Sequence, residues 1–258
     1  VCDTALVALF ERNAYIAATG VNDTLMGTAT VSDAAPLYLD VVTFTAVANT
    51  GYHFTGWSNG STDATIEVVV GGDTTVTANF ALNQYTATAT VNAAAMGTAT
   101  VSNAAPYHGD TVVFTAVAAE GCHFIGWSNG DTAASIELVA VADIALTANF
   151  AINTYLVTVS YDATRGGVMD AAGAAVAAGT VYTVNHGDTL HFMADAFDNG
   201  SRFVNWTDGS VVLTTEAIDY VVTSAVTLTA NFASIDSAML TLSVNDASMG
   251  TVSGAGMY

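Results

Sequence analysis

The chain has 258 residues, of which 52% are apolar, and a formal net charge of −20. Only three basic side chains, all of them arginine, stand against 23 carboxylates. This balance excludes nucleic acid as a partner, because binding to phosphate needs clustered Lys and Arg. No run of about 18 apolar residues is present, so we expect no membrane insertion in this segment.

The first predicted element is a strand over residues 3–10, within a segment that we assign to residues 1–14. Its sequence, Asp-Thr-Ala-Leu-Val-Ala-Leu-Phe, matches Asp-Ile-Ala-Leu-Thr-Ala-Asn-Phe at residues 143–150. Matching segments within one chain indicate a repeat architecture. Residues 1–14 are therefore interpreted as the C-terminal strand of a preceding repeat.

Two whole repeats follow, over residues 15–84 and 85–154, at an offset of 70 residues. The motif Phe-x-Gly-Trp-Ser-Asn-Gly begins at Phe54 in the first and at Phe124 in the second, and Thr-Ala-Asn-Phe closes both. The abundant Val and Thr favour strands over helices. Alternation and turn signals predict six short strands in the second repeat, at residues 85–91, 98–101, 111–117, 123–128, 135–139 and 145–150.

The first two of these strands are expected to form a hairpin, and Asn129-Gly130 predicts a type I′ hairpin turn later in the repeat. A short helical turn is considered at residues 103–107 or 131–134. The third repeat, residues 155–238, has 12 extra residues, which we place in a lengthened loop. Residues 239–258 are interpreted as the opening hairpin of a following repeat. The predicted fold is all-β: a tandem array of small antiparallel domains arranged end to end.

Aromatic residues recur at matching places in the three repeats and are predicted to form the core of each. A sugar-binding platform of exposed tryptophans is the alternative. The predicted core residues are Trp57, Trp127, Trp206, Phe54, Phe124, Phe203, Phe80, Phe150 and Phe232.

The recurring order is a Tyr-led strand, a Gly-Thr-Val-type hairpin, Gly-Asp-Thr-Val, Gly-x-x-Phe-x-Gly-Trp-Ser and a terminal Thr-Ala-Asn-Phe. This order resembles the divergent internalin B B-repeat family of bacterial surface and secreted proteins, over nearly the whole chain. The resemblance implies compact, β-grasp-like domains with no catalytic residues. Two departures affect loops: Leu39 replaces a Gly in the first repeat, and Asn205-Trp-Thr replaces Gly-Trp-Ser in the third.

The histidines of the repeats suit structural roles better than metal binding or catalysis. His53 and His123 occupy equivalent places, but the third repeat has Arg202 there. His108 and His186 precede Gly-Asp, where the first repeat has Tyr38. The aspartate of this step recurs in all repeats and is predicted to cap a turn, as Asp40, Asp110 and Asp188.

We find no catalytic, cofactor-binding or metal-binding motif and expect no cofactor. Bound calcium is left open because the chain is rich in Asp and Asn, although no Asp-x-Asp-x-Asp-Gly loop is present. Cys2 and Cys122 lie in different repeats, so free thiols or a bond between chains are expected rather than an internal disulfide.

The predicted function is structural: a non-enzymatic stalk or fibre segment of an adhesin-like bacterial protein, located outside the cell or on its surface. Its expected partners are neighbouring repeats and, through self-assembly, other copies. The four-residue connectors 81–84 and 151–154 contain no Gly, Pro or Ser, which favours a stiff rod. A tandem binding module that recognises a glycan or a host or neighbour-cell protein is the alternative.

Overall fold

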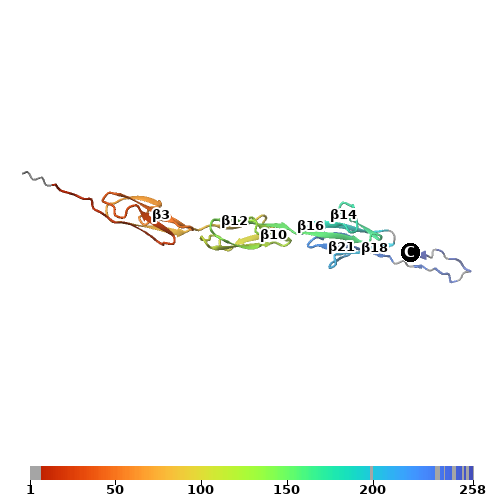
Figure 1. Ribbon diagram of the computed structural model, residues 1–258. Helices are drawn as coiled ribbons and strands as arrows, with labels where there is room; N and C mark the ends of the chain where they lie inside the picture. Colours follow the sequence, from red (N-terminus) through yellow and green to blue (C-terminus); the bar gives the residue numbers. More distant parts are fainter. Residues whose placement is uncertain are drawn as a thin grey trace, which may run out of the picture. The chain divides into compact units, whose positions relative to one another are not determined.

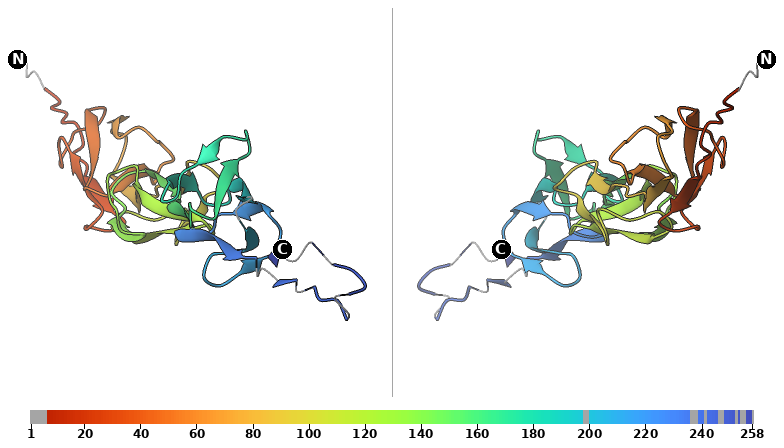
Figure 2. Two further views of the ribbon diagram at one scale, coloured as in Figure 1. Left: turned by 90° about the vertical axis from the view of Figure 1, so that its right-hand side faces the viewer. Right: turned by 90° about the vertical axis from the view of Figure 1, so that its left-hand side faces the viewer.

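The structure, a computed structural model, describes residues 7–197 and 200–235, and five short stretches of the C-terminal segment: 239–240, 242–245, 248–251, 253 and 256–257. Figures 1 and 2 draw every regular element in these residues as a strand, and none as a helix. The prediction of an all-β fold with tandem repeats is confirmed. The predicted helical turns at residues 103–107 and 131–134 are wrong, because these residues form bends and extended loops.

The first repeat is built from two three-stranded sheets. Its strands are β1 (Ala17–Val21), β2 (Gly27–Val31), β3 (Val41–Ala48), β4 (Tyr52–Trp57), β5 (Thr65–Val69) and β6 (Thr74–Leu82). One sheet has the order β1-β6-β4 and the other the order β2-β3-β5. The core between them includes residues from both sheets, so the repeat is a small two-layer sandwich.

The second repeat has the same plan. Its strands are β7 (Ala87–Val91), β8 (Gly97–Val101), β9 (Thr111–Ala118), β10 (Cys122–Trp127), β11 (Ser135–Val139) and β12 (Ile144–Ile152). The sheets have the orders β10-β12-β7 and β11-β9-β8. The β-grasp-like detail implied by the family resemblance is not seen, because a β-grasp needs a helix packed on its sheet and the residues described here contain none.

The third repeat adds strands to both sheets. Its strands are β13 (Thr154–Tyr161), β14 (Gly166–Asp170), β15 (Ala175–Val176), β16 (Val181–Asn185), β17 (Thr189–Ala196), β18 (Ser201–Thr207), β19 (Val212–Leu213), β20 (Ala217–Val221) and β21 (Val226–Ser234). Its sheets have the orders β16-β13-β21-β18-β19 and β15-β14-β17-β20. The stretch 170–180, in which the 12 extra residues are predicted as a loop, therefore contains the strand β15, and β16 follows directly after it.

Two predicted hairpins are wrong. The opening strands β7 and β8 lie in different sheets, as do β10 and β11 on either side of Asn129-Gly130. Only Gly130 of that pair has a positive φ, 96°, so the turn is not the type I′ turn that joins paired strands. Short connections in the sandwich carry the chain from one sheet to the other. The alternation of residues alone suggests instead that the two connected strands are neighbours in one sheet.

The predicted core aromatics pack against one another in each repeat. Trp57 and Trp127 are each 3% exposed and Trp206 is fully buried. The preceding phenylalanine of the motif meets the indole with ring centroids 5.5–6.3 Å apart. Each indole N–H donates to a loop carbonyl, on Asp63, Ala133 and Glu216 respectively. Phe80 and Phe150 are buried, whereas Phe54, Phe124, Phe203 and Phe232 are half-buried around these centres.

The first and last strands of every repeat pair in parallel. Ala17 lies opposite Thr74 and Val21 opposite Ala78, and the β7–β12 and β13–β21 pairs follow the same pattern. One sheet of each repeat is therefore mixed, whereas the other sheet of the first and third repeats is purely antiparallel. Because paired parallel strands run the same way, the chain enters each repeat at one end of this sheet and leaves it at the other.

The chain divides into two compact units. One comprises Val1–Val117 with Phe124–Asn149, and the other Ala118–His123 with Phe150–Tyr258. Outside the three repeats, residues 7–13 contain no strand, although a strand is predicted there. Near the C-terminus, β22 (Met239–Leu240) pairs antiparallel with β23 (Gly256–Met257). Residues 242–245, 248–251 and 253 form no strand, although the predicted opening hairpin covers most of them, and the remaining residues of the predicted terminal strand and hairpin lie outside the described residues.

Candidate functional site

The connector between the first two repeats is held by backbone hydrogen bonds on both sides. The N–H of Asn83 donates to the carbonyl of Gly51 at 2.8 Å, and the N–H of His108 donates to the carbonyl of Asn83, also at 2.8 Å. Gly51 belongs to the turn before β4, and His108 to the loop before β9. One connector residue thus bridges a turn of the first repeat and a loop of the second.

Ring packing closes this contact. Gly51 has a φ of 85°, which favours glycine, and a Cβ built on it would overlap the His108 ring. On its other side the His108 ring lies against Tyr85, with centroids 6.1 Å apart. Glycine at residue 51 therefore serves both the turn and the close approach of the imidazole.

Side chains extend the contact as an ordered series of hydrogen bonds. His53 Nδ1 lies 2.9 Å from Asn83 Oδ1, which can only accept, so His53 donates. Asn83 Nδ2 donates to the Tyr85 hydroxyl at 3.4 Å, and that hydroxyl lies 3.4 Å from His108 Nδ1. We call Gly51, His53, Asn83, Tyr85 and His108 the first joint.

The second joint, all of it within the second compact unit, repeats this arrangement with Gly121, His123, Asn153, Tyr155 and His186. The N–H groups of Asn153 and His186 donate to Gly121 and Asn153 carbonyls, each at 2.8 Å. His123 Nδ1 lies 2.8 Å from Asn153 Oδ1. Tyr155 and His186 have ring centroids 6.0 Å apart, and His186 Nδ1 is buried without a hydrogen-bond partner.

The entrance of the first repeat keeps the backbone part of a joint with different side chains. The N–H of Tyr38 donates to the Asn13 carbonyl at 2.8 Å, and the Tyr38 ring lies 6.4 Å from Tyr15. Arg12 pairs with Asp40 at 2.6 Å. The Leu37 N–H and then the Arg12 side chain hold the pKa of Asp40 below its usual value. Tyrosine can therefore occupy the place of the joint histidine.

The predicted turn-capping aspartates fix the loops that carry these rings. The carboxylates of Asp40, Asp110 and Asp188 accept the N–H groups of Leu37, Tyr107 and Asn185 at 2.8–3.0 Å. This prediction is confirmed. Each bond closes the loop immediately around Tyr38, His108 or His186, so the cap positions the joint ring.

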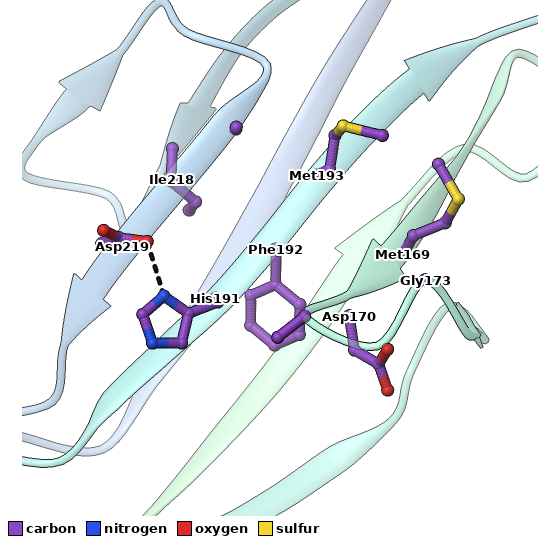
Figure 3. A pocket seen from close by; sticks show the side chains of 10 residues that line it. Met169, Asp170, Gly173, His191, Phe192, Met193, Ile218 and Asp219 are labelled. Atoms are coloured by element: carbon purple, nitrogen blue, oxygen red, sulfur yellow. Dashed lines mark hydrogen bonds and ion pairs between the residues drawn. The ribbon is translucent and has the colours of Figure 1, made fainter.

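A groove of about 330 Å³ lies on the four-stranded sheet of the third repeat. Figure 3 shows Met169 and Met193 at one end and a His191–Asp219 pair at the other, with Nδ1 and Oδ1 2.6 Å apart. No Ser, Thr or Cys lines the groove. The groove therefore offers an apolar surface with a polar end.

A second carboxylate of the third repeat orders the loop after β18. Asp208 accepts the N–H groups of Val211 and Ser210 at 2.7 and 2.8 Å, and the Tyr220 hydroxyl at 2.9 Å. These bonds, led by that from Val211, hold the pKa of Asp208 far below its usual value. Burial, and then the bond to Asp208, raise the pKa of Tyr220 to about 12.

The sequence predicted structural roles for the histidines but not that they lie in the same contacts between repeats. The joints unite His53 with His108 and His123 with His186, through connector residues that were assessed only for stiffness. The shared Asn-x-Tyr at residues 13–15, 83–85 and 153–155 is the signal that could have identified them. Of the two cysteines, Cys122 is a half-exposed free thiol, and Cys2 lies outside the described residues.

In the part of the chain that the structure describes, no three His, Cys, Asp or Glu side chains gather as a metal site. Nor does this part contain any helix with the length and apolar character needed to cross a membrane.

Among the comparisons with known proteins, the match to a family model agrees with the repeat architecture. Among solved structures, the Bacillus anthracis TIE protein matches with a TM-score of 0.42 and 8% identity, over 84% of this chain and 50% of that one. The chain thus spans half the length of that protein. No curated protein sequence matches. The divergent InlB B-repeat domain matches three consecutive segments, residues 17–84, 87–154 and 157–236. The chain therefore belongs to the divergent InlB B-repeat family, whose repeats occur in bacterial surface proteins.

Proposed function

We propose that this chain is a structural segment of an extracellular or cell-surface adhesin-like bacterial protein, in which tandem repeats form a stalk or fibre. The observation that carries the proposal is the parallel pairing of the first and last strands in every repeat. The nine residues of β6 cover about 30 Å at roughly 3.3 Å per residue. Each repeat therefore moves the chain forward by about that distance instead of turning it back.

The joints support the same role. A connector without partners would act as a free hinge, but Asn83 and Asn153 are each bonded to the turn before them and to the loop after them. Two backbone hydrogen bonds and a packed ring restrict bending at the connector. Neighbouring repeats are thus the first partners of each domain, as in other arrays dominated by nearest-neighbour contacts.

The chemistry of the described side chains supports a role without catalysis or a cofactor. The residues that line the groove of the His191–Asp219 pair include no Ser, Thr or Cys. The other histidines bond to Asn83 or Asn153 or pack against Tyr85 or Tyr155. These contacts are those of a scaffold. Self-assembly into a fibre, with Cys2 and Cys122 as thiols available between chains, is part of the proposal.

Small-angle X-ray scattering on the 258-residue chain tests the stalk. A compact domain of this length would have a radius of gyration of about 18 Å. A stalk of three repeats should give a markedly larger radius and a long tail in the distance distribution, extending to roughly 80–100 Å. A near-spherical profile with a radius close to 18 Å would contradict the proposal.

The groove in the third repeat favours a second candidate, binding of a glycan or a protein side chain by this repeat. In the first repeat, one row of paired residues across the sheet consists of threonines, namely Thr30, Thr45 and Thr65. The third repeat has Met169, Met193 and Ala217 in the same places. Restoring threonine with M169T/M193T should abolish such binding without unfolding the repeat. Glycan-array and cell-adhesion measurements on both chains would separate a binding module from a stalk.

A further inference from the structure

We propose that the first and second repeats each bind a short, uncharged peptide strand rich in Ala and Val at an open edge of their sheets. The strands β1 and β2 lie at the edges of the two sheets of the first repeat, as β7 and β8 do in the second. Residues of β1, β2 and the turn between them line a hollow of about 240 Å³, and those of β7, β8 and their turn line one of about 270 Å³. We call these hollows the first and second edge slots.

The backbone groups beside the first edge slot are unpaired. The N–H of Asn22 donates to a carbonyl of β6, and the N–H of Ser32 donates to a carbonyl of β3. Because the backbone groups of alternate residues point to opposite sides of a strand, those of Thr19 on β1 and Ala29 on β2 point away from their sheets. Neither residue has a backbone hydrogen bond on this side in the part of the chain that the structure describes. Both edges can therefore accept a further strand.

The second edge slot repeats this arrangement. The N–H of Asn92 donates to β12 and that of Ser102 to β9, so the backbone groups of Ala89 and Ala99 point outward. Carbonyls of the proline loop reach β7 only as far as Ala87. The edge beyond Ala87 is open, as the edge at Thr19 is in the first repeat.

The third repeat shows what the equivalent edges accept. Its residues 171–185 include β15, which pairs with β14, and β16, which pairs with β13, with a turn around Gly179 between them. Val159 takes the place of Thr19 in the parallel pairing with the last strand of the repeat. The N–H and the carbonyl of Val159 are both bonded to this segment, at 2.9 and 2.8 Å. A segment of the chain thus pairs with the groups that Thr19 leaves unpaired.

The same segment also contributes an apolar side chain. Val168, which takes the place of Ala29, pairs with Val176. Val176 is 5% exposed and belongs to the hydrophobic core of the third repeat. A hollow of about 300 Å³ remains beside this segment, but Val159 does not line it, whereas Thr19 lines the first edge slot. The segment therefore occupies the part of the slot that lies along the first strand.

The charge of the chain and the lining of the slots define the partner. No charged side chain lines either slot, and the chain has a net charge of −20. An acidic strand, including one from a second copy of this chain, would be repelled. Residues 174–181, Ala-Ala-Val-Ala-Ala-Gly-Thr-Val, contain no charge. The partner is therefore an uncharged strand of this kind, held by main-chain hydrogen bonds with valine as its apolar contact.

An NMR titration of the nitrogen-15-labelled 258-residue chain with a synthetic peptide of residues 174–181 tests the proposal. The readouts are the outward amides of the two slots, namely Thr19, Ala29, Ala89 and Ala99. Their signals should shift, and at saturation their exchange with solvent should slow by about tenfold, because they become hydrogen-bonded. The amides of Val159 and Val168 are already paired and should not respond.

Proline substitutions separate main-chain pairing from general stickiness. Ala89→Pro removes an outward N–H from the second slot at an edge position, where proline is tolerated. We expect binding there to weaken about tenfold through the lost hydrogen bond, while binding at the first slot is unchanged. Ala89→Ser keeps the N–H and is the matched control. The peptide variant Val176→Pro needs no altered chain and should bind both slots about tenfold more weakly.

Three results would overturn the proposal. They are slot amides that do not shift at millimolar peptide, equal binding of the peptide and its Val176→Pro variant, and a response of Val159 and Val168 in place of the slots. Shifts of the slot amides with chain concentration alone would assign the edges to a second copy and would also overturn it. The proposal goes beyond the stalk and does not rest on it, since failure of the stalk would appear in the scattering profile without peptide.

Discussion

The second and third repeats share a core and differ at their edges. In the second repeat, two backbone hydrogen bonds link the outer edge of β7 to the neighbouring loop. The N–H of Tyr85 donates to the Pro106 carbonyl, and the N–H of Ala87 donates to the Ala104 carbonyl. In the third, β16 forms a full antiparallel ladder along β13, and β15 pairs with β14. An open edge strand is a template for unwanted pairing. The longer segment between β14 and β17 of the third repeat therefore covers edges that the shorter repeats leave to a proline loop.

The two repeats also differ in the residues on the outward faces of their strands, whereas the inward faces are alike. Inward positions are kept, as with Phe114 and Phe192 in equivalent places of β9 and β17. The next position outward is Thr115 in the second repeat and Met193, 44% exposed, in the third. Because alternate residues face opposite sides of a strand, one face can diverge while the other holds the core. Four predictions test this division.

The largest effect is expected for the core tryptophans. Trp127→Ala should lower the unfolding free energy of the second repeat by about 3–5 kcal/mol, because it empties a closely packed centre. Trp206→Ala should do the same to the third. Ile125, 53% exposed on the same strand as Trp127, provides the control, and Ile125→Ala should cost far less. Residue-resolved exchange in denaturant would measure this, and equal losses in both repeats would show that the cores are not separate.

Two adjacent glycines sharpen the difference between faces. A Cβ on Gly166 would overlap the Phe232 ring and approach the Asp195 carbonyl, whereas one on Gly167 meets only Phe197 at 3.8 Å. Gly166→Ala should therefore destabilise the third repeat by about 1–3 kcal/mol through overpacking. Gly167→Ala should be close to neutral. Thermal unfolding of both variants gives the comparison, and similar costs would refute the inward–outward assignment.

A backbone difference between repeats gives a stabilising prediction. Leu39 has a φ of 69°, while Gly109 and Gly187 occupy the equivalent place with φ values of 89° and 85°. The left-handed region costs a side chain about 1–2 kcal/mol, partly offset by the greater freedom of glycine when unfolded. Leu39→Gly should raise the stability of the first repeat by up to about 1 kcal/mol. The reciprocal Gly109→Leu should lower that of the second by at least as much, and the same denaturant titration measures both.

Much of the fold could be predicted from sequence because the signals were local and repeated. The strand positions follow from alternation, and the core from aromatics such as Trp57 and Trp127 at one offset. The assignment of strands to sheets could not be predicted. A Gly such as Gly97 at a turn signals a reversal of the chain but does not show whether the next strand joins the same layer.

The joints were missed for a different reason. Each joint combines residues from two repeats, so comparison of repeats with one another treats His53 and His108 as unrelated positions. Only the close approach of the His108 ring to Gly51 reveals their connection. The first repeat has Tyr38 where the second has His108, and this exchange is natural for a ring that packs against a neighbouring tyrosine.

The smallest effect concerns Asp208, a capping carboxylate in the loop after β18 of the third repeat. Its pKa is lowered, chiefly by the N–H of Val211, so it favours the folded state above the ordinary aspartate pKa of about 4. That contribution is lost as pH falls below about 4. The pKa of Tyr220 is raised to about 12, so its contribution is present below about pH 10 and is lost as pH rises towards 12.

Asp208→Asn separates these contributions from those of the rest of the repeat. Asparagine keeps one oxygen for the N–H groups of Ser210 and Val211, but its amide nitrogen cannot accept the Tyr220 hydroxyl. We expect a loss of about 0.5 kcal/mol at neutral pH, typical of an exposed hydrogen bond. Thermal unfolding of the third repeat should then depend less on pH, both below 4 and above 10. If thermal unfolding of Asp208→Asn depended on pH below 4 as strongly as that of the unchanged chain, this loop would open before the repeat unfolds. The strands β18 and β20 would then hold the sandwich without it.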